Sequence, residues 1–171
     1  MTVPARAFVA LGSNLGDRAQ HLGRALRALR ATRGVGQVEC SSVYETAPLG
    51  PPQPHYLNAV ASLTTTLGAR ALLERLLAIE AAEGRERGAE RNAPRTLDLD
   101  VLLFAGNRID EVGLQVPHPR LHERAFVLVP LADLAPDLRP PGLGATVEEL
   151  LEKLSPAARA DVRPWSGGRT G

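Results

Sequence analysis

The stretch that decides the fold is "PRTLDLDVLLF", Pro94 to Phe104, in which two aspartates open an otherwise apolar segment. Side chains on a strand point alternately to opposite faces, so Asp98 and Asp100 project the same way, with Cα atoms roughly 6.6 Å apart. After Asp100 both faces are apolar, which predicts a strand in the interior of a sheet. Two like charges at the entrance of such a strand require a compensating positive charge.

Length and composition set the protein class. We expect residues 1–171 to form a single domain, with a loose tail from about residue 155. The apolar fraction of 44%, the charged fraction of 23% and the net charge of +1 are ordinary for a soluble protein and give no bulk attraction to nucleic acid. No apolar run approaches the ~20 residues of a membrane span, and the N-terminus does not resemble a secretory signal. A cytoplasmic location is therefore the default expectation.

Hydrophobic periodicity predicts the elements around the aspartate-bearing strand. We expect strands at 6–12, 37–45 and 56–66, and helices at 16–34 and 69–84. Further along we expect a turn with a short strand at 108–119, two helical pieces in 120–136 broken near Pro130, and a small helix at 146–154. The order strand, helix, two strands, helix, strand is the pattern of a ferredoxin-like α+β sandwich, an antiparallel-rich sheet with helices packed on one face and a C-terminal elaboration.

Two explanations fit the aspartate pair. The plainer one is a pair of solvated carboxylates at a strand edge, bonded to Arg95. The other is a hard-cation site, because Mg²⁺ takes one or two carboxylates and fills its other positions with water and substrate phosphates. The preceding charged loop favours the second, since guanidinium groups bind phosphate oxygens in bidentate fashion. The arginines of this region are Arg85, Arg87, Arg91 and Arg95. The chain has no G-x-x-x-x-G-K-[ST] loop, so arginine and magnesium must neutralise any nucleotide phosphates.

Two further groups of residues have both a plain and a functional interpretation. His118 lies between two prolines, which fix the direction of its side chain. It is either a packed or solvated residue or a donor to phosphate, with Arg124 six positions on. Tyr56 and Asn58 share one face of a strand. They are either core and edge residues or a platform that stacks on and hydrogen-bonds a flat heterocycle.

Collinear segments of the chain resemble the family of 6-hydroxymethyl-7,8-dihydropterin pyrophosphokinases over about residues 7 to 137. They are "ALGSNLGDR", "SSVYETAPLG", "YLNAV", "IEAAEGRERGAERNAPRTLDLDVLLF" and "VPHPRLHERAFVLVPL". The resemblance implies a ferredoxin-like fold and a reaction of folate biosynthesis, the transfer of pyrophosphate from ATP to the hydroxymethyl group of a reduced pterin, with AMP as the second product. It implies ATP and the pterin as the small-molecule partners, with no nucleic acid, membrane or obligate protein partner.

The resemblance also implies a role for each site residue. Two magnesium ions would be held by Asp98 and Asp100, which with Arg85 and Arg95 would form the catalytic set. The ATP phosphates would contact Arg85, Arg87, Arg95, His118 and Arg124. The pterin would lie between Tyr56 and Phe126 with Asn58 at its edge, in a pocket lined by Thr46, Pro48 and Leu49. Glu80 would be a helix residue beneath the site.

Two other functions remain alternatives. One is a different magnesium-dependent phosphotransferase on the same scaffold. The other is an RNA-binding ferredoxin-like module, which the near-neutral charge and the few aromatics on the predicted strands disfavour.

Overall fold

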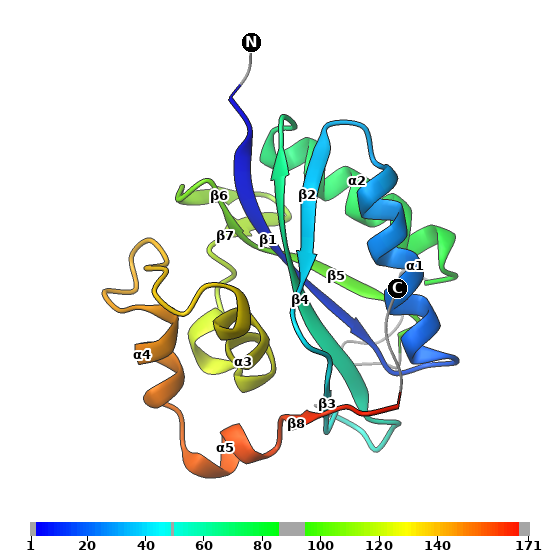
Figure 1. Ribbon diagram of the computed structural model, residues 1–171, viewed down its shortest axis with the longest axis vertical. Coiled ribbons are helices and arrows are strands. Elements are labelled where there is room, and N and C mark those ends of the chain that lie inside the picture. Colours follow the sequence, from blue (N-terminus) through cyan, green and yellow to red (C-terminus); the bar gives the residue numbers. More distant parts are fainter. Residues whose placement is uncertain (1–2, 49, 86–94, 168–171) are drawn as a thin grey trace.

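The computed structural model describes residues 3–48, 50–85 and 95–167, and the centre of the fold is one antiparallel sheet (Figure 1). The strands are β1 (Ala5–Ser13), β2 (Val35–Cys40), β3 (Tyr44–Thr46), β4 (Tyr56–Thr65), β5 (Asp98–Phe104) and β8 (Arg163–Pro164), with a separate hairpin of β6 (Ile109–Glu111) and β7 (Leu114–Val116). The order in the sheet is β5-β1-β4-β3-β8, and β2 also pairs with β4. The path β5-β1-β4-β2 is the arrangement expected of a ferredoxin-like sheet, so the predicted fold class is confirmed.

Helices cover both faces of this sheet. They are α1 (Arg18–Ala31), α2 (Ala69–Ala82), α3 (Ala125–Leu134), α4 (Val147–Glu152) and α5 (Pro156–Ala160), with a 3₁₀ turn at Leu121–Glu123. One core, which includes Leu11 and Leu99, lies between the sheet and α1 and α2. A second core, which includes Val60 and Leu128, lies under α3 and α4. The expectation of helices on one face was wrong, because the C-terminal elaboration folds back over the face that the two long helices leave open (Figure 1).

The aspartate-bearing strand is an edge strand rather than an interior one. Within the described residues β5 pairs only with β1. It is nevertheless buried on both faces, because Val101 packs in the first core and Leu102 in the second. Its outer edge is partly covered, since the backbone N–H of His118 donates to the carbonyl of Leu102 at 3.0 Å. Both faces of β5 are therefore buried, although among the described residues only one of its edges pairs with another strand.

Most of the other predicted elements agree with the structure, although two short strands, β6 and β7, lie where one was expected. The strand expected at 37–45 is divided into β2 and β3, and the helical break falls at Arg124 rather than near Pro130. Pro130 lies within α3, where the lost backbone hydrogen bond is offset by burial of Leu128 and Leu131 against the sheet.

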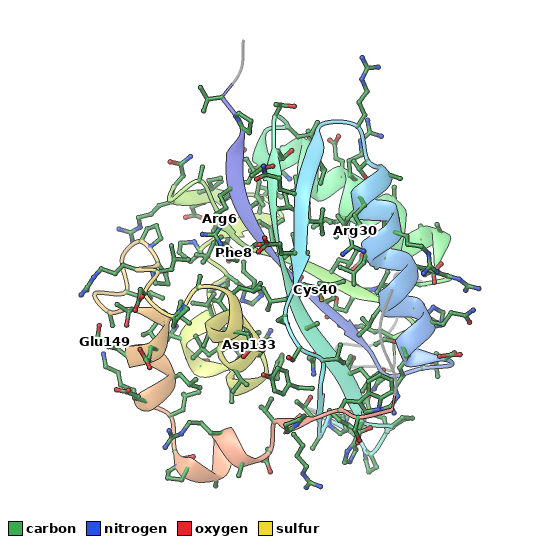
Figure 2. The ribbon with its side chains drawn as sticks, in the orientation of Figure 1. Arg6, Phe8, Arg30, Cys40, Asp133 and Glu149 are labelled. Carbon is green, nitrogen blue, oxygen red and sulfur yellow. The ribbon has the colours of Figure 1, made fainter. Side chains whose placement is uncertain are left out.

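We expected a loose tail from about residue 155; the structure gives residues 155–167 regular elements. They form α5, and then β8, which pairs with β3. In this region the hydroxyl of Tyr44 on β3 donates to Asp133 of α3 at 2.7 Å, which ties the sheet to the C-terminal layer. Figure 2 shows the position of Asp133 on α3. Among the described residues there is no helix with the length and apolar character that crossing a bilayer requires.

Candidate active site

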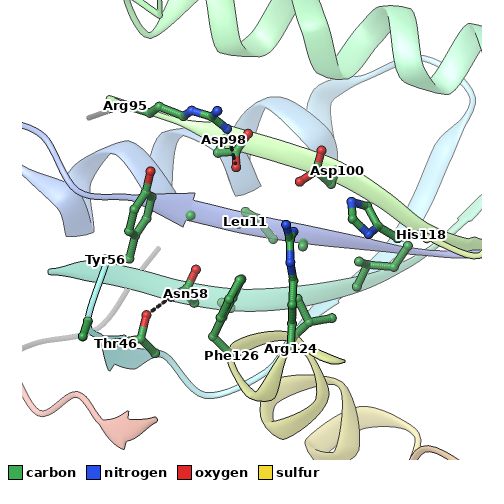
Figure 3. Close-up of a pocket in the computed structure, with 16 residues that line it drawn as sticks. Leu11, Thr46, Tyr56, Asn58, Arg95, Asp98, Asp100, His118, Arg124 and Phe126 are labelled. Atoms are coloured by element: carbon green, nitrogen blue, oxygen red, sulfur yellow. Dashed lines mark hydrogen bonds and ion pairs between the residues drawn. The ribbon is translucent and has the colours of Figure 1, made fainter. Parts of the chain in front are cut away.

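A pocket opens on the face of the sheet that α3 covers, where β1, β4 and β5 lie side by side (Figure 3). Its polar and aromatic lining comes from four regions of the chain that are distant in sequence: Thr46, Tyr56, Asn58, Arg95, Asp98, Asp100, His118, Arg124 and Phe126. Antiparallel pairing explains why they meet. Gly12 of β1 lies opposite Asn58 on one side and opposite Asp98 on the other, so the strand ends deliver these side chains to one place.

Asp98 is held by two arginines. Arg85 Nη1 lies 2.7 Å from Asp98 Oδ1, and Arg95 Nη1 lies 3.1 Å from Asp98 Oδ2. Glu80 holds Arg85 in position, because the same Nη1 donates to Glu80 Oε2 at 2.6 Å. Glu80 is 1% exposed, and its Oε2 also accepts from the backbone N–H of Leu99 at 2.8 Å. This buried carboxylate therefore fixes both an arginine and the start of β5.

Asp100 has a different environment. Burial, and then the charges of Asp98 and Glu80, raise its pKa from 3.8 to about 7. Arg124 and Arg95 lower the pKa, but neither forms an ion pair with Asp100 in the described part of the chain. Within the described residues Asp100 thus lacks the direct ion pairs that hold Asp98.

The oxygen donors of this pair suit magnesium. Two carboxylates on one strand face match the ligand preference of Mg²⁺, which leaves its remaining positions to water and phosphate. Across the described ranges, His, Cys, Asp and Glu nowhere gather in a group of three or more that would hold a metal ion by themselves. Two carboxylates leave the other positions of such an ion to water and to phosphate oxygens.

His118 is set up as a neutral donor. Its Nδ1 accepts from the backbone N–H of Arg120 at 3.1 Å, so we assign the ring proton to Nε2. Burial, and then the neighbouring Arg124, lower the pKa of the imidazole to about 4. The side chain points into the pocket beside Asp100 (Figure 3). Near neutral pH it can donate one hydrogen bond without adding charge.

The opposite end of the pocket has the character of a heterocycle site. Tyr56 and Phe126 supply aromatic rings, and Asn58 Nδ2 donates to Thr46 Oγ1 at 2.6 Å (Figure 3). This bond uses the amide nitrogen and leaves Asn58 Oδ1 beside Gly12, where a Cβ would lie 3.1 Å from that oxygen. Gly12, the last residue of the strand expected at 6–12, thus lines the pocket.

The remaining predicted residues have different positions. Ala47 lines the pocket, whereas Pro48 is not among its lining residues, and the pterin contact expected of Pro48 stays a prediction. Leu49 and Arg87 lie outside the described residues. The position of Ala47 in the pocket could not be predicted, because an alanine side chain has no functional group that indicates a ligand contact.

A second cleft adjoins the pocket. It runs beside the β6–β7 hairpin, from Leu73 to Pro119, and it shares Asp100 and His118 with the pocket. Two molecules bound in the two clefts would therefore meet at the carboxylate of Asp100 and the neutral imidazole of His118. This arrangement suits transfer of a charged group between two substrates.

Comparison with known proteins agrees with this geometry. A family model described as 7,8-dihydro-6-hydroxymethylpterin-pyrophosphokinase (HPPK) matches residues 8–136. The chain is similar to two proteins named 2-amino-4-hydroxy-6-hydroxymethyldihydropteridine pyrophosphokinase. The one from Pseudomonas aeruginosa is 48% identical over 85% of this chain and 90% of the relative. The one from Methylorubrum extorquens is 46% identical over 89% of this chain and 95% of the relative.

Solved structures show the same fold. An HPPK-DHPS variant from Plasmodium falciparum superimposes with a TM-score of 0.72 at 14% identity. The match covers 90% of this chain but only 44% of that longer chain. At this identity the likeness extends to the fold alone.

Proposed function

Since this chain belongs to the 7,8-dihydro-6-hydroxymethylpterin-pyrophosphokinase family, we propose that the pocket in Figure 3 is its active site. The enzyme transfers pyrophosphate from ATP to the hydroxymethyl group of 6-hydroxymethyl-7,8-dihydropterin in folate biosynthesis, and AMP is the other product. The observation that carries the assignment is the pair Asp98 and Asp100. The two carboxylates project from one strand face, Asp100 lies at the junction of the two clefts, and its charge is unpaired within the described residues.

We assign the nucleotide to the cleft beside the β6–β7 hairpin, with its phosphates directed toward the shared boundary. There the phosphates meet the Nε2–H of His118 and the guanidinium groups of Arg85, Arg95 and Arg124. Arg87 belongs to this set as a prediction from the sequence. Asp98 and Asp100 are the proposed ligands of two magnesium ions, which when bound neutralise charge on the transferring phosphates.

The pterin is assigned to the pocket between Tyr56 and Phe126. Asn58 presents its Oδ1 acceptor to the donor-bearing edge of the heterocycle, because Thr46 holds the amide nitrogen. The hydroxymethyl group then faces the aspartates across the pocket floor, where Gly12 leaves room that any side chain would fill.

Positioning and charge account for the chemistry that these residues perform. In the reaction the pterin hydroxyl oxygen bonds to the β-phosphorus of ATP, the bond from that phosphorus to the α–β bridging oxygen breaks to release AMP, and the hydroxyl proton passes to solvent. His118, with a pKa of about 4, is too weak a base to drive the attack, and both oxygens of Asp98 are held by arginines. The described residues therefore act by alignment and by stabilising charge that develops on the transferring group.

Substitution of each aspartate tests the assignment. We expect Asp98→Asn and Asp100→Asn each to lower kcat by about 100-fold or more, because each removes an oxygen donor at the transferring phosphates. The measurement is AMP formation at rising Mg²⁺ concentration. Asp137→Asn, an exposed residue in the turn after α3, is the matched control and should turn over normally. Near-normal turnover of either site variant at saturating Mg²⁺ would rule out that residue as a metal ligand.

A further inference from the structure

One fully buried amide joins the two sides of the active site. Asn14 directly follows β1 and is 0% exposed. Its Nδ2 donates to Gln53 Oε1 at 2.7 Å and to the carbonyl of Pro54 at 3.0 Å. Its Oδ1 accepts from the backbone N–H of Arg95 at 2.8 Å, and its own N–H donates to the carbonyl of Arg95 at 3.1 Å. Partners 39 and 81 positions away thus converge on one side chain.

The two partners belong to different halves of the site. Gln53 and Pro54 lie in the pterin-side segment, residues 47–55, which connects Thr46 of β3 to Tyr56 of β4. Both of those flanking residues line the pocket. Arg95 lines the pocket from the other side and pairs with Asp98 at 3.1 Å. Asn14 therefore connects the wall of the heterocycle site to an arginine of the phosphate site.

Neighbouring hydroxyls do not duplicate this link. Ser13 Oγ and Thr96 Oγ1 flank the junction in sequence, and both are buried without a hydrogen-bond partner in the part of the chain that the structure describes. The pterin-side segment does have a separate anchor at its borders. Arg18 Nη1 donates to Glu45 Oε2 at 2.7 Å and to the carbonyl of His55 at 2.9 Å. Loss of the Asn14 link should therefore leave the segment attached while separating its position from that of Arg95.

We propose that Asn14 is a positioning residue that couples pterin binding to nucleotide binding through the backbone of Arg95. The proposal rests on the function assigned above, which places the two substrates on either side of this amide. When one ligand fixes its side of the link, the other side is already in place, so each ligand strengthens binding of the other. Such coupling is reciprocal by thermodynamic necessity.

The substitution Asn14→Asp keeps the hydrogen bond to Arg95 and removes those to Gln53 and Pro54. One carboxylate oxygen still accepts from the N–H of Arg95, whereas the other faces the oxygens of Gln53 and Pro54 and can no longer donate to them. Gln53→Ala removes one of the two bonds from the opposite side, without a new buried charge, and is the second variant if Asn14→Asp does not fold. Asn107→Asp, at an exposed turn, is the control for the substitution itself.

The experiment is calorimetric titration of the intact chain with a non-hydrolysable ATP analogue and Mg²⁺, with and without 6-hydroxymethylpterin. In wild type we expect the pterin to tighten analogue binding by about 5-fold or more, within the usual range of coupling between sites. In Asn14→Asp this ratio should fall toward one, while analogue binding alone changes by less than about 2-fold, because the Arg95 contact is retained. Gln53→Ala should give an intermediate ratio, and Asn107→Asp the wild-type ratio.

A wild-type ratio of one would overturn the proposal, and so would an unchanged ratio in folded Asn14→Asp or, if that variant does not fold, in Gln53→Ala. Failure of the assigned function is a separate result. If wild type forms no pterin diphosphate from ATP and Mg²⁺, the function fails. If wild type forms pterin diphosphate at a normal rate but the substitutions do not change the pterin-induced tightening of analogue binding, only the coupling role of Asn14 fails.

Discussion

At the scale of single residues, two aspartates that look equivalent in the sequence have unequal surroundings. Both oxygens of Asp98 lie within 3.1 Å of an arginine nitrogen. Asp100 has no ion pair within the described residues, and burial raises its pKa to about 7. Asp98 therefore contributes ion pairs to the folded state, whereas Asp100 in its charged form opposes folding until a cation arrives.

This asymmetry predicts how stability depends on pH without metal. The folded-state pKa of Asp100 lies above the unfolded value, so the stabilisation that its protonated form contributes is present below pH 3.8 and is lost as pH rises through about 7. Asparagine mimics the protonated carboxyl. Asp100→Asn should match wild type near pH 4 and gain of the order of 2–4 kcal/mol of unfolding free energy at pH 8. Asp98→Asn should be less stable than wild type at pH 8.

Urea unfolding in EDTA at the two pH values measures both differences. An Asp100→Asn gain of the same size at pH 4 and pH 8 would show that the pKa of this carboxyl is not raised. Asp137→Asn, as an exposed carboxylate, should show no gain at either pH.

Sequence reasoning identified the polar residues that strand alternation places on the same face. The same-face positions of Asp98 and Asp100, and of Tyr56 and Asn58, follow from strand alternation, and the structure brings all four to one pocket. Asn14 carried no such signal, because its partners come from two connecting segments whose positions depend on the whole fold.

At the scale of elements, the C-terminal segment is the part that pattern reasoning misjudged. β8 has only two residues, too few for any periodicity, and it exists because it pairs with β3. Val162 is buried against Tyr44, and the N–H of Trp165 donates to the carbonyl of Val43 at 3.0 Å. Long-range pairing of this kind is visible only in three dimensions.

Shortening the chain tests what this segment does. Ending the chain after Asp161 should lower the unfolding free energy by about 2 kcal/mol or more, from the lost burial of Val162 and Trp165. It should also raise KM for the pterin more than KM for ATP, because β3 carries Thr46. Ending it after Gly167 is the control and should change neither quantity. Equal stability and equal KM in the two truncated chains would show that β8 does not support the pocket.

At the scale of the whole molecule, the two faces of the sheet differ in what they pack against. The α1–α2 face is a continuous apolar core, and the α3 face holds both the second core and the pocket (Figures 1 and 3). The order of elements was sufficient to predict the ferredoxin-like topology. It was not sufficient to predict the covered second face, because short helices in a proline-rich C-terminal region have weak periodicity.

The arrangement of the two clefts has a consequence for the reaction. They share Asp100 and His118, and our proposal places the acceptor hydroxyl on one side of this junction and the ATP phosphates on the other. Residues from β1, β4, β5 and the start of α3 line the pocket on one side of that junction. The active site is thus a property of the assembled sheet rather than of any one motif.

The most direct test of this account is to identify the nucleotide that the enzyme releases. The chain is incubated with ATP, Mg²⁺ and 6-hydroxymethyl-7,8-dihydropterin, and the products are separated and quantified, with Asp100→Asn run in parallel. We predict that AMP appears in equal amount with a pterin carrying two added phosphates, and that Asp100→Asn forms neither at a comparable rate. Accumulation of ADP with a singly phosphorylated pterin, or undiminished AMP formation by Asp100→Asn, would contradict the account.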